Sequence, residues 1–169
     1  PYQWTKQIAS HWGGTRNGTV VHWPSGFEGK GEIRSQFHHV IDIAATVLDA
    51  AGLPQPDFVN GLQQMPLHGV SMRDSFGRAD APESHETQYF EMLGSRAIYH
   101  DGWKAVTFKP LGAMYDDGID PDAPFEDDPW ELYHVAEDYS ECHDLAEAEP
   151  DRLADLVARW WHEARSRPG

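Results

Sequence analysis

The stretch RAIYHDGWKAVTF, residues 96–108, decides how the second half of the chain is expected to fold. Two runs rich in β-branched and aromatic residues lie on either side of Asp101-Gly102, and an Asp-Gly pair in this setting is the signal for a two-residue type I′ β-hairpin. Similar short runs at 88–92 and 131–135 predict two more strands. The sequence therefore predicts a small antiparallel sheet.

Two helices are expected, because apolar residues twice recur with helical spacing. The first stripe runs from Val40 to Ala51 and is followed by Gly52, which suits a left-handed C-terminal cap. The second stripe runs from Leu153 to Ala164. We expect this C-terminal helix to cover one face of the sheet, which makes the second half α+β.

Elsewhere the local signals are weaker. Residues 19–23 form a β-branched and aromatic run that Pro24 stops, and they predict a buried strand. Residues 53–86 contain four prolines and little periodicity, so they are expected to form a long irregular connection.

Composition excludes several classes of function. The chain has 169 residues, with 13 Lys and Arg against 28 Asp and Glu, for a formal net charge of −15. Such a charge repels nucleic acids and anionic lipids, so neither a nucleic acid nor a membrane is expected as a partner. The single cysteine, Cys142, cannot form a disulfide within the chain or a cysteine-based metal cluster.

Few residues suggest chemistry by pattern alone. Lys6 lies upstream of Gly13-Gly14, and a lysine ammonium beside a backbone that can bend tightly can bind a tetrahedral oxyanion. Spacing alone leaves Lys6 and His11 open to a second interpretation, as ordinary surface residues. The acidic stretch 116–128 does not fit the EF-hand pattern and is expected to be a solvated negative loop, so no metal site is expected in this chain.

Six segments of the sequence, taken in order, carry a family resemblance: Lys6 with Gly13-Gly14-Thr15-Arg16, the run 19–24 ending in Trp-Pro, the helix 42–52, Gly69-Val70-Ser71, the hairpin 96–105 and the stretch 130–145. Together they resemble the C-terminal part of the sulfatase family, in its bacterial arylsulfatase branch. The resemblance covers nearly the whole chain. Three positions in the last segment depart from the family pattern: His134 and Asp144 replace the usual Asp and Asn, and Tyr139 replaces Pro.

The resemblance implies a fold class, α/β to α+β, that of the C-terminal part of an alkaline-phosphatase-like sulfatase. Residues 1–80 would be the tail of the large sulfatase α/β domain. Residues 81–169 would be the C-terminal subdomain, a small antiparallel sheet packed against a long terminal helix.

The resemblance also implies a chemistry. Sulfatases cleave sulfate esters with a formylglycine made from Cys or Ser in a C/S-x-P-x-R motif, beside a divalent ion, usually calcium, held by Asp and Asn. Cys142 is followed by His143-Asp144, so it does not match that motif. Both the formylglycine and the calcium ligands are therefore expected upstream of this chain. Lys6 matches a family active-site position, as a catalytic and sulfate-binding cation, and His11 is a second candidate for substrate binding.

We therefore expect the C-terminal segment of a sulfuric ester hydrolase of the arylsulfatase type, which acts on a small-molecule sulfate ester. The chain begins with Pro1 rather than Met, so it is expected to be a piece of a longer protein, to partner the missing N-terminal sulfatase domain, and to be inactive alone. Two alternatives remain: a phosphodiesterase or phosphonate monoester hydrolase of the same superfamily, and a non-catalytic acidic interaction module.

Overall fold

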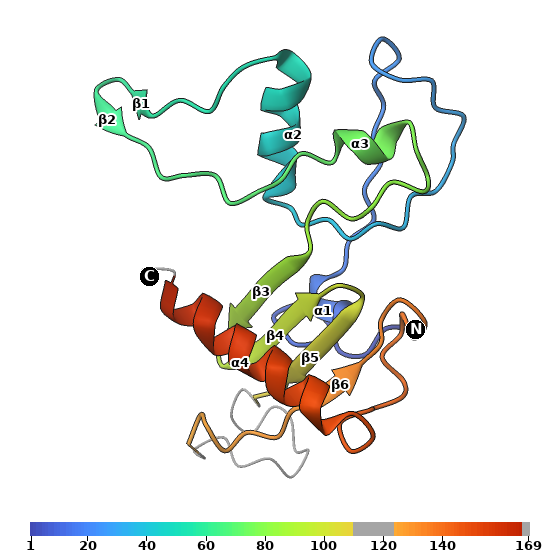
Figure 1. Cartoon of the computed structure of the whole chain (residues 1–169), viewed down its shortest axis with the longest axis vertical. Helices are drawn as coiled ribbons and strands as arrows, with labels where there is room; N and C mark the ends of the chain where they lie inside the picture. The colour runs from blue at the N-terminus through green and yellow to red at the C-terminus, as the bar shows by residue number, and fades with distance from the viewer. Residues whose placement is uncertain (110–123, 167–169) are drawn as a thin grey trace. The chain divides into compact units, whose positions relative to one another are not determined.

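The computed structural model describes residues 1–109 and 124–166 (Figure 1). These residues form two compact units: Pro1–Gly18 together with Thr87–Gly169, here called the sheet unit, and Thr19–Glu86, called the α2 unit. This grouping differs from the boundary expected near residue 80, because the first 18 residues fold with the sheet. The assignment of residues 1–80 to a large sulfatase domain stays a prediction.

The sheet unit contains the expected antiparallel sheet. Asp101 and Gly102 both adopt left-handed φ angles, 46° and 77°, as a type I′ turn requires. The predicted hairpin and the two further strands are thus confirmed. The four strands, in the order β3-β4-β5-β6, are β3 (Thr87–Met92), β4 (Ser95–His100), β5 (Trp103–Thr107) and β6 (Glu131–Tyr133).

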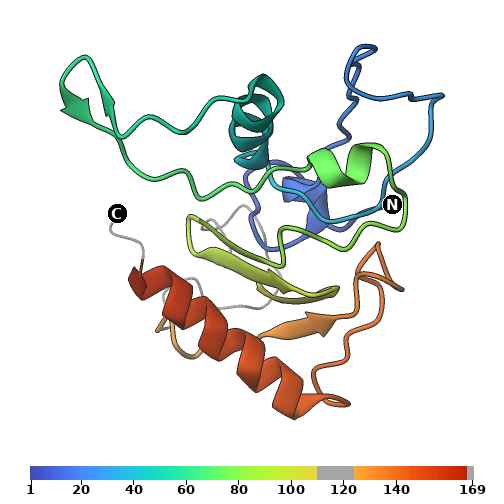
Figure 2. The ribbon, with the colours of Figure 1, turned by 45° about the horizontal axis from the view of Figure 1, so that its top comes forward.

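Helix α4 (Pro150–Ser166) covers one face of this sheet (Figure 2). Ile98, Ala105 and Leu132, from three neighbouring strands, form a fully buried cluster with Leu156 and Trp160 of the helix. Burial of a leucine or isoleucine side chain in such a cluster contributes roughly 1.5–3 kcal/mol to folding. The predicted packing of a terminal helix on an antiparallel sheet is therefore confirmed.

The opposite face of the sheet is covered by residues 1–18, which include the short helix α1 (Trp12–Thr15) (Figure 2). Side chains alternate between the faces of a sheet, so the neighbours of the Ile98 cluster point toward α1. Tyr99 lies 6.5 Å from the Trp12 ring, between ring centroids, and Lys104 Nζ lies 3.6 Å from the centroid of that ring. The N-terminal segment thus packs directly on the sheet that the later strands form.

In the α2 unit, helix α2 (Asp42–Ala51) ends at Gly52, whose φ of 67° gives the left-handed cap expected from the sequence. The apolar stripe of this helix, however, is not buried by the described residues, since Val40 and Val47 are 70% and 60% exposed. The other elements of this unit are short: β1 (Phe58–Val59), β2 (Leu62–Gln63) and α3 (Arg73–Phe76). Helix formation is confirmed, but the described residues of the unit leave its apolar stripe exposed.

The prediction of a buried strand at residues 19–23 is wrong. This segment has no strand conformation, and Val20 is 95% exposed. A β-branched run becomes a strand only when another strand pairs with its backbone, and no described residue of the α2 unit does so.

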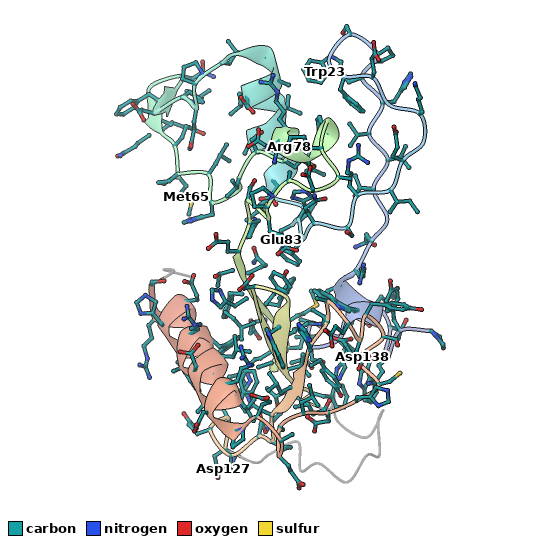
Figure 3. The ribbon with its side chains drawn as sticks, turned by 45° about the vertical axis from the view of Figure 1, so that its right-hand side comes forward. Trp23, Met65, Arg78, Glu83, Asp127 and Asp138 are labelled. Carbon is teal, nitrogen blue, oxygen red and sulfur yellow. The ribbon has the colours of Figure 1, made fainter. Side chains whose placement is uncertain are left out.

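The prediction of a solvated acidic loop is wrong at its last residue, Asp128. Glu126 and Asp127 are exposed, as expected; Asp127 is labelled in Figure 3. Asp128 is instead buried and accepts hydrogen bonds from Arg96 and from Lys109, the latter at 2.8 Å. The acidic residues between positions 116 and 122 lie outside the described residues. Within the described residues, no helix has the length and apolarity needed to span a membrane.

Candidate functional site

Lys6 lies on a constrained turn formed by residues 3–8, here called the Lys6 loop. Trp4 and Gln7, on either side of it, have left-handed φ angles of 62° and 76°. Such a conformation costs a non-glycine residue on the order of 1–3 kcal/mol and persists only where neighbouring structure enforces it. The Lys6 side chain is exposed, and among the described residues it has no ion-pair partner. The loop therefore presents a free ammonium from a fixed backbone.

Gly13 and Gly14 hold the Lys6 loop by close backbone contact. A Cβ atom on Gly13 would lie 2.1 Å from the Gln3 carbonyl oxygen, and one on Gly14 would lie 1.8 Å from that of Ile8. The amide of Gly13 also donates a hydrogen bond of 3.0 Å to the Gln3 carbonyl. These glycines lie in α1, so their function is close approach rather than the tight bend expected from the sequence.

Aromatic packing fixes the start of the same loop. The Trp4 ring stacks on Phe108, the residue directly after β5, with ring centroids 4.0 Å apart and planes 16° apart. Ile8, at the other end of the loop, is buried. Both ends of the Lys6 loop are therefore anchored to the sheet unit, and Lys6 lies on the part between them.

His11 lies beneath the surface, with 1% of its area exposed. Its Nδ1 lies 2.9 Å from the Ser10 hydroxyl, and its Nε2 lies 3.1 Å from Glu131 Oε2. Because an ionised carboxylate can only accept, Nε2 donates to Glu131, and in the neutral ring Nδ1 accepts from Ser10. The geometry supports a role for His11 in holding the segment that follows Lys6. Substrate binding by His11 stays a prediction.

Glu131 remains ionised despite its position. Burial alone would raise its pKa, but hydrogen bonds from His11 and Tyr133 outweigh burial and hold the pKa of this carboxyl below its usual value. The Tyr133 hydroxyl donates to Glu131 at 2.6 Å, and burial together with this bond raises the pKa of Tyr133. The four side chains Ser10, His11, Glu131 and Tyr133 thus form one continuous hydrogen-bonded chain between the N-terminal segment and β6.

A buried ion pair, which the sequence analysis did not identify, lies under α1. Lys104 Nζ donates to Glu141 Oε1 at 2.6 Å, and neither residue has measurable exposure. The other oxygen of Glu141 accepts from the backbone amide of Trp12 at 2.7 Å, and Lys104 also faces the Trp12 ring. The available signal was a lysine inside an otherwise apolar strand, since lysine is almost never fully buried without a partner.

The pH dependence of stability should report on Lys104. Burial lowers the pKa of Lys104 to about 8, although Glu141 opposes the shift. Between pH 8 and the unperturbed value of 10.5, the unfolded chain holds a proton that the folded chain has released. The free energy of unfolding should therefore rise with pH in this window. Urea titrations should show this rise in the wild type and a smaller one in Lys104→Met/Glu141→Gln, which lacks both charges; identical slopes would contradict the assignment.

A second cluster surrounds Asp42 in the α2 unit. The buried carboxylate of Asp42 accepts from the amides of His39 and Val70 and from His85 Nδ1, at 2.7–2.9 Å. Burial would raise the pKa of Asp42, but these bonds lower it below its usual value. All of the bonds join segments of the unit, so the cluster is structural. Over the described residues as a whole, no group of three or more His, Cys, Asp or Glu side chains could hold a metal ion, so they do not fit the calcium that the resemblance implies.

The three departures from the sulfatase pattern are accommodated locally. Asp144 accepts the amides of Leu132 and Ala146 at 2.9 Å each, which an asparagine oxygen could also do. His134 stacks on Trp103 with ring centroids 4.2 Å apart, and Tyr139 is exposed.

Comparison with known proteins places this fold among sulfatases. No family model matches the sequence. Over 151 residues the chain is 28% identical to an uncharacterized sulfatase of Schizosaccharomyces pombe. The matched region covers 88% of this chain and 24% of that protein. The chain thus spans about a quarter of the length of this curated relative.

Solved structures show the same likeness at the level of the fold. A Bacteroides thetaiotaomicron protein designated BT33336S-sulf, reported with the metabolism of multiple glycosaminoglycans, matches with a TM-score of 0.66 and 19% identity, over 95% of this chain and 31% of that one. The crystal structure of Ps i-CgsB matches with a TM-score of 0.54 and 22% identity, over 82% of this chain and 26% of that one. The expected resemblance to the C-terminal portion of a sulfatase, with an antiparallel sheet against a terminal helix, is confirmed.

Proposed function

We propose that this chain is the C-terminal segment of an arylsulfatase-type hydrolase and that Lys6 contributes a sulfate-binding cation to its active site. The observation that carries the proposal is the free, exposed ammonium of Lys6 on a loop held at both ends. The similarity to a sulfatase over most of the chain supports it. The nucleophile, a formylglycine, would lie upstream, as would the ligands of any calcium ion.

The chemistry of sulfate ester cleavage explains what Lys6 would do. As the bond from sulfur to the ester oxygen breaks, negative charge grows on the departing oxygen while the sulfate oxygens keep theirs. An ammonium already fixed at that position stabilises this charge without reorganising, and it can donate up to three hydrogen bonds. The close contact of Gly13 and Gly14 with the loop would keep the Lys6 backbone in place during turnover.

The exposed apolar residues of the α2 unit also support the proposal. Val20 and Val47 are 95% and 60% exposed, and they lie in the run and in the helix that resemble a strand and a helix of the large sulfatase domain. A larger domain that pairs with residues 19–23 and packs on α2 would bury both side chains.

The test compares two esters on two forms of the protein. The complete polypeptide that carries this chain should hydrolyse an aryl sulfate in preference to the matching aryl phosphate, and mass spectrometry should find a formylglycine in a C/S-x-P-x-R peptide. The 169-residue chain alone should show no turnover above background. Preference for the phosphate ester would instead identify a phosphodiesterase or phosphonate monoester hydrolase. Absence of both the motif and any esterase activity would identify a non-catalytic module.

A further inference from the structure

Glu141 joins the loop before α4 to the segment that carries Lys6. Its side chain accepts from the Trp12 amide, the first residue of α1, and its backbone carbonyl accepts from the side chain of Gln3, the first residue of the Lys6 loop. These contacts span 129 and 138 residues of sequence. Glu141 therefore contacts both α1 and the first residue of the Lys6 loop.

Helix α1 depends on this contact because it cannot hold itself in place. It has only four residues, and the side chain of its own N-cap residue, His11, makes no capping hydrogen bond. Isolated helices of this length are not stable in water, so α1 persists through its tertiary contacts. The first amide of such a helix needs an acceptor, and Glu141 supplies it with a charged oxygen.

The position of Glu141 is itself enforced. Its φ of 57° is in the left-handed region, which is unfavourable for a glutamate. Asp138, labelled in Figure 3, holds this turn: its carbonyl accepts from the Glu141 amide at 3.1 Å, and its carboxylate accepts from the amides of Cys142 and His143. On the other side, Lys104 neutralises the buried carboxylate. The oxygen that holds α1 is thus fixed from two directions.

The contact is transmitted to Lys6 through the glycines of α1. Trp12 is followed directly by Gly13 and Gly14, which touch the carbonyl oxygens at both ends of the Lys6 loop at distances that leave no room for a Cβ atom. A shift of α1 therefore has to move the loop. A misplacement of about 1 Å is enough to cost a catalytic group a large part of its effect.

We propose that Glu141, held by Lys104, is a positioning residue for Lys6: it fixes α1, and α1 fixes the loop that presents the ammonium. The role of Lys6 itself rests on the function proposed above. Glu141 touches no substrate, so its effect on turnover is indirect and should disappear when Lys6 is absent.

The test uses two variants of the complete polypeptide that differ in one oxygen acceptor. Glu141→Gln alone would leave the Lys104 charge buried without its partner, so both variants also carry Lys104→Met, which removes that charge. Lys104→Met/Glu141→Gln keeps an acceptor for the Trp12 amide, whereas Lys104→Met/Glu141→Leu replaces it with an apolar group of similar size. Glu137→Gln, in the same loop but exposed, is the control for surface charge.

Two measurements separate this proposal from the proposed function. Amide hydrogen exchange of residues 8–16 should be roughly tenfold faster in the leucine variant than in the glutamine variant, as expected from the loss of about 1.4 kcal/mol of local stability, with β4 and β5 unchanged. Turnover of an aryl sulfate should fall by a similar factor, mainly in kcat. In a Lys6→Ala background the two variants should turn over equally.

Each result has a definite meaning. Equal exchange rates in the two variants would overturn the positioning role, whatever the enzyme does. Unequal turnover that persists in the Lys6→Ala background would also overturn it, because the effect would then not pass through Lys6. Faster exchange together with a wild-type protein that cleaves no sulfate ester would retain the positioning of the loop and reject the proposed function.

Discussion

Lys6→Ala in the complete polypeptide is expected to lower kcat/KM for an aryl sulfate by about 10²–10³-fold, the usual effect of removing one fixed group that stabilises developing negative charge. Part of the loss should appear in KM, since the ammonium would bind the sulfate oxygens of the ground state as well. Lys6→Arg should be intermediate, because guanidinium keeps the charge but presents it as a planar fork on a different stem. Steady-state kinetics of the three proteins measure this directly.

A matched control is available in Lys30, another exposed lysine, which lies in the α2 unit. Lys30→Ala changes the net charge equally and should leave kcat/KM within about twofold of wild type, as expected for a surface substitution away from the site. Both variants should have the wild-type unfolding midpoint. If Lys6→Ala retains the activity of Lys30→Ala, Lys6 does not bind the sulfate, and the proposed function loses the observation that carries it.

The sequence predicted the parts of the fold that local patterns determine. Asp101-Gly102 specified a type I′ hairpin because few other pairs tolerate two left-handed residues, and the apolar stripe from Leu153 to Ala164 specified a helix against the sheet. The equivalent turn at Leu93-Gly94, with φ angles of 53° and 88°, was not predicted, since leucine seldom adopts this conformation. The position of this turn follows from the register in which β3 pairs with β4, and not from the residues of the turn.

The site was harder to predict because its contacts join distant parts of the chain. Nothing local marks Trp12 and Glu141 as neighbours, and the resemblance to sulfatases pointed to Lys6 without showing what holds it. The prediction of a strand at residues 19–23 was wrong for the opposite reason. The local signal is that of a strand, but within the described residues no strand pairs with it. Patterns predict an element, and its partners decide whether the element forms.

Asp128→Ala should be the most destabilising single substitution of those considered, with a loss of about 3–5 kcal/mol in the free energy of unfolding. Asp128 is buried between Arg96 and Lys109, and Arg96 is itself fully buried. Burial lowers the pKa of Arg96, which Asp128 opposes, so removing the carboxylate leaves a guanidinium in the core without its counter-charge. Asp127→Ala, next to it and exposed, should change stability by less than about 0.5 kcal/mol. Urea unfolding followed by tryptophan fluorescence compares the two.

A double variant shows whether the cost comes from the stranded charge or from the lost contacts. The guanidinium of Arg96 lies 3.7 Å from the centroid of the Phe125 ring and within 5.3 Å of Trp160, so its site is otherwise aromatic and suits a methionine. Arg96→Met/Asp128→Asn removes the buried guanidinium together with its counter-charge, and the asparagine oxygen remains as an acceptor for Lys109. If the stranded charge dominates, this variant recovers most of the stability lost in Asp128→Ala. If it remains equally unstable, the contacts of Asp128 with its neighbours, rather than its charge, hold this corner of the sheet unit together.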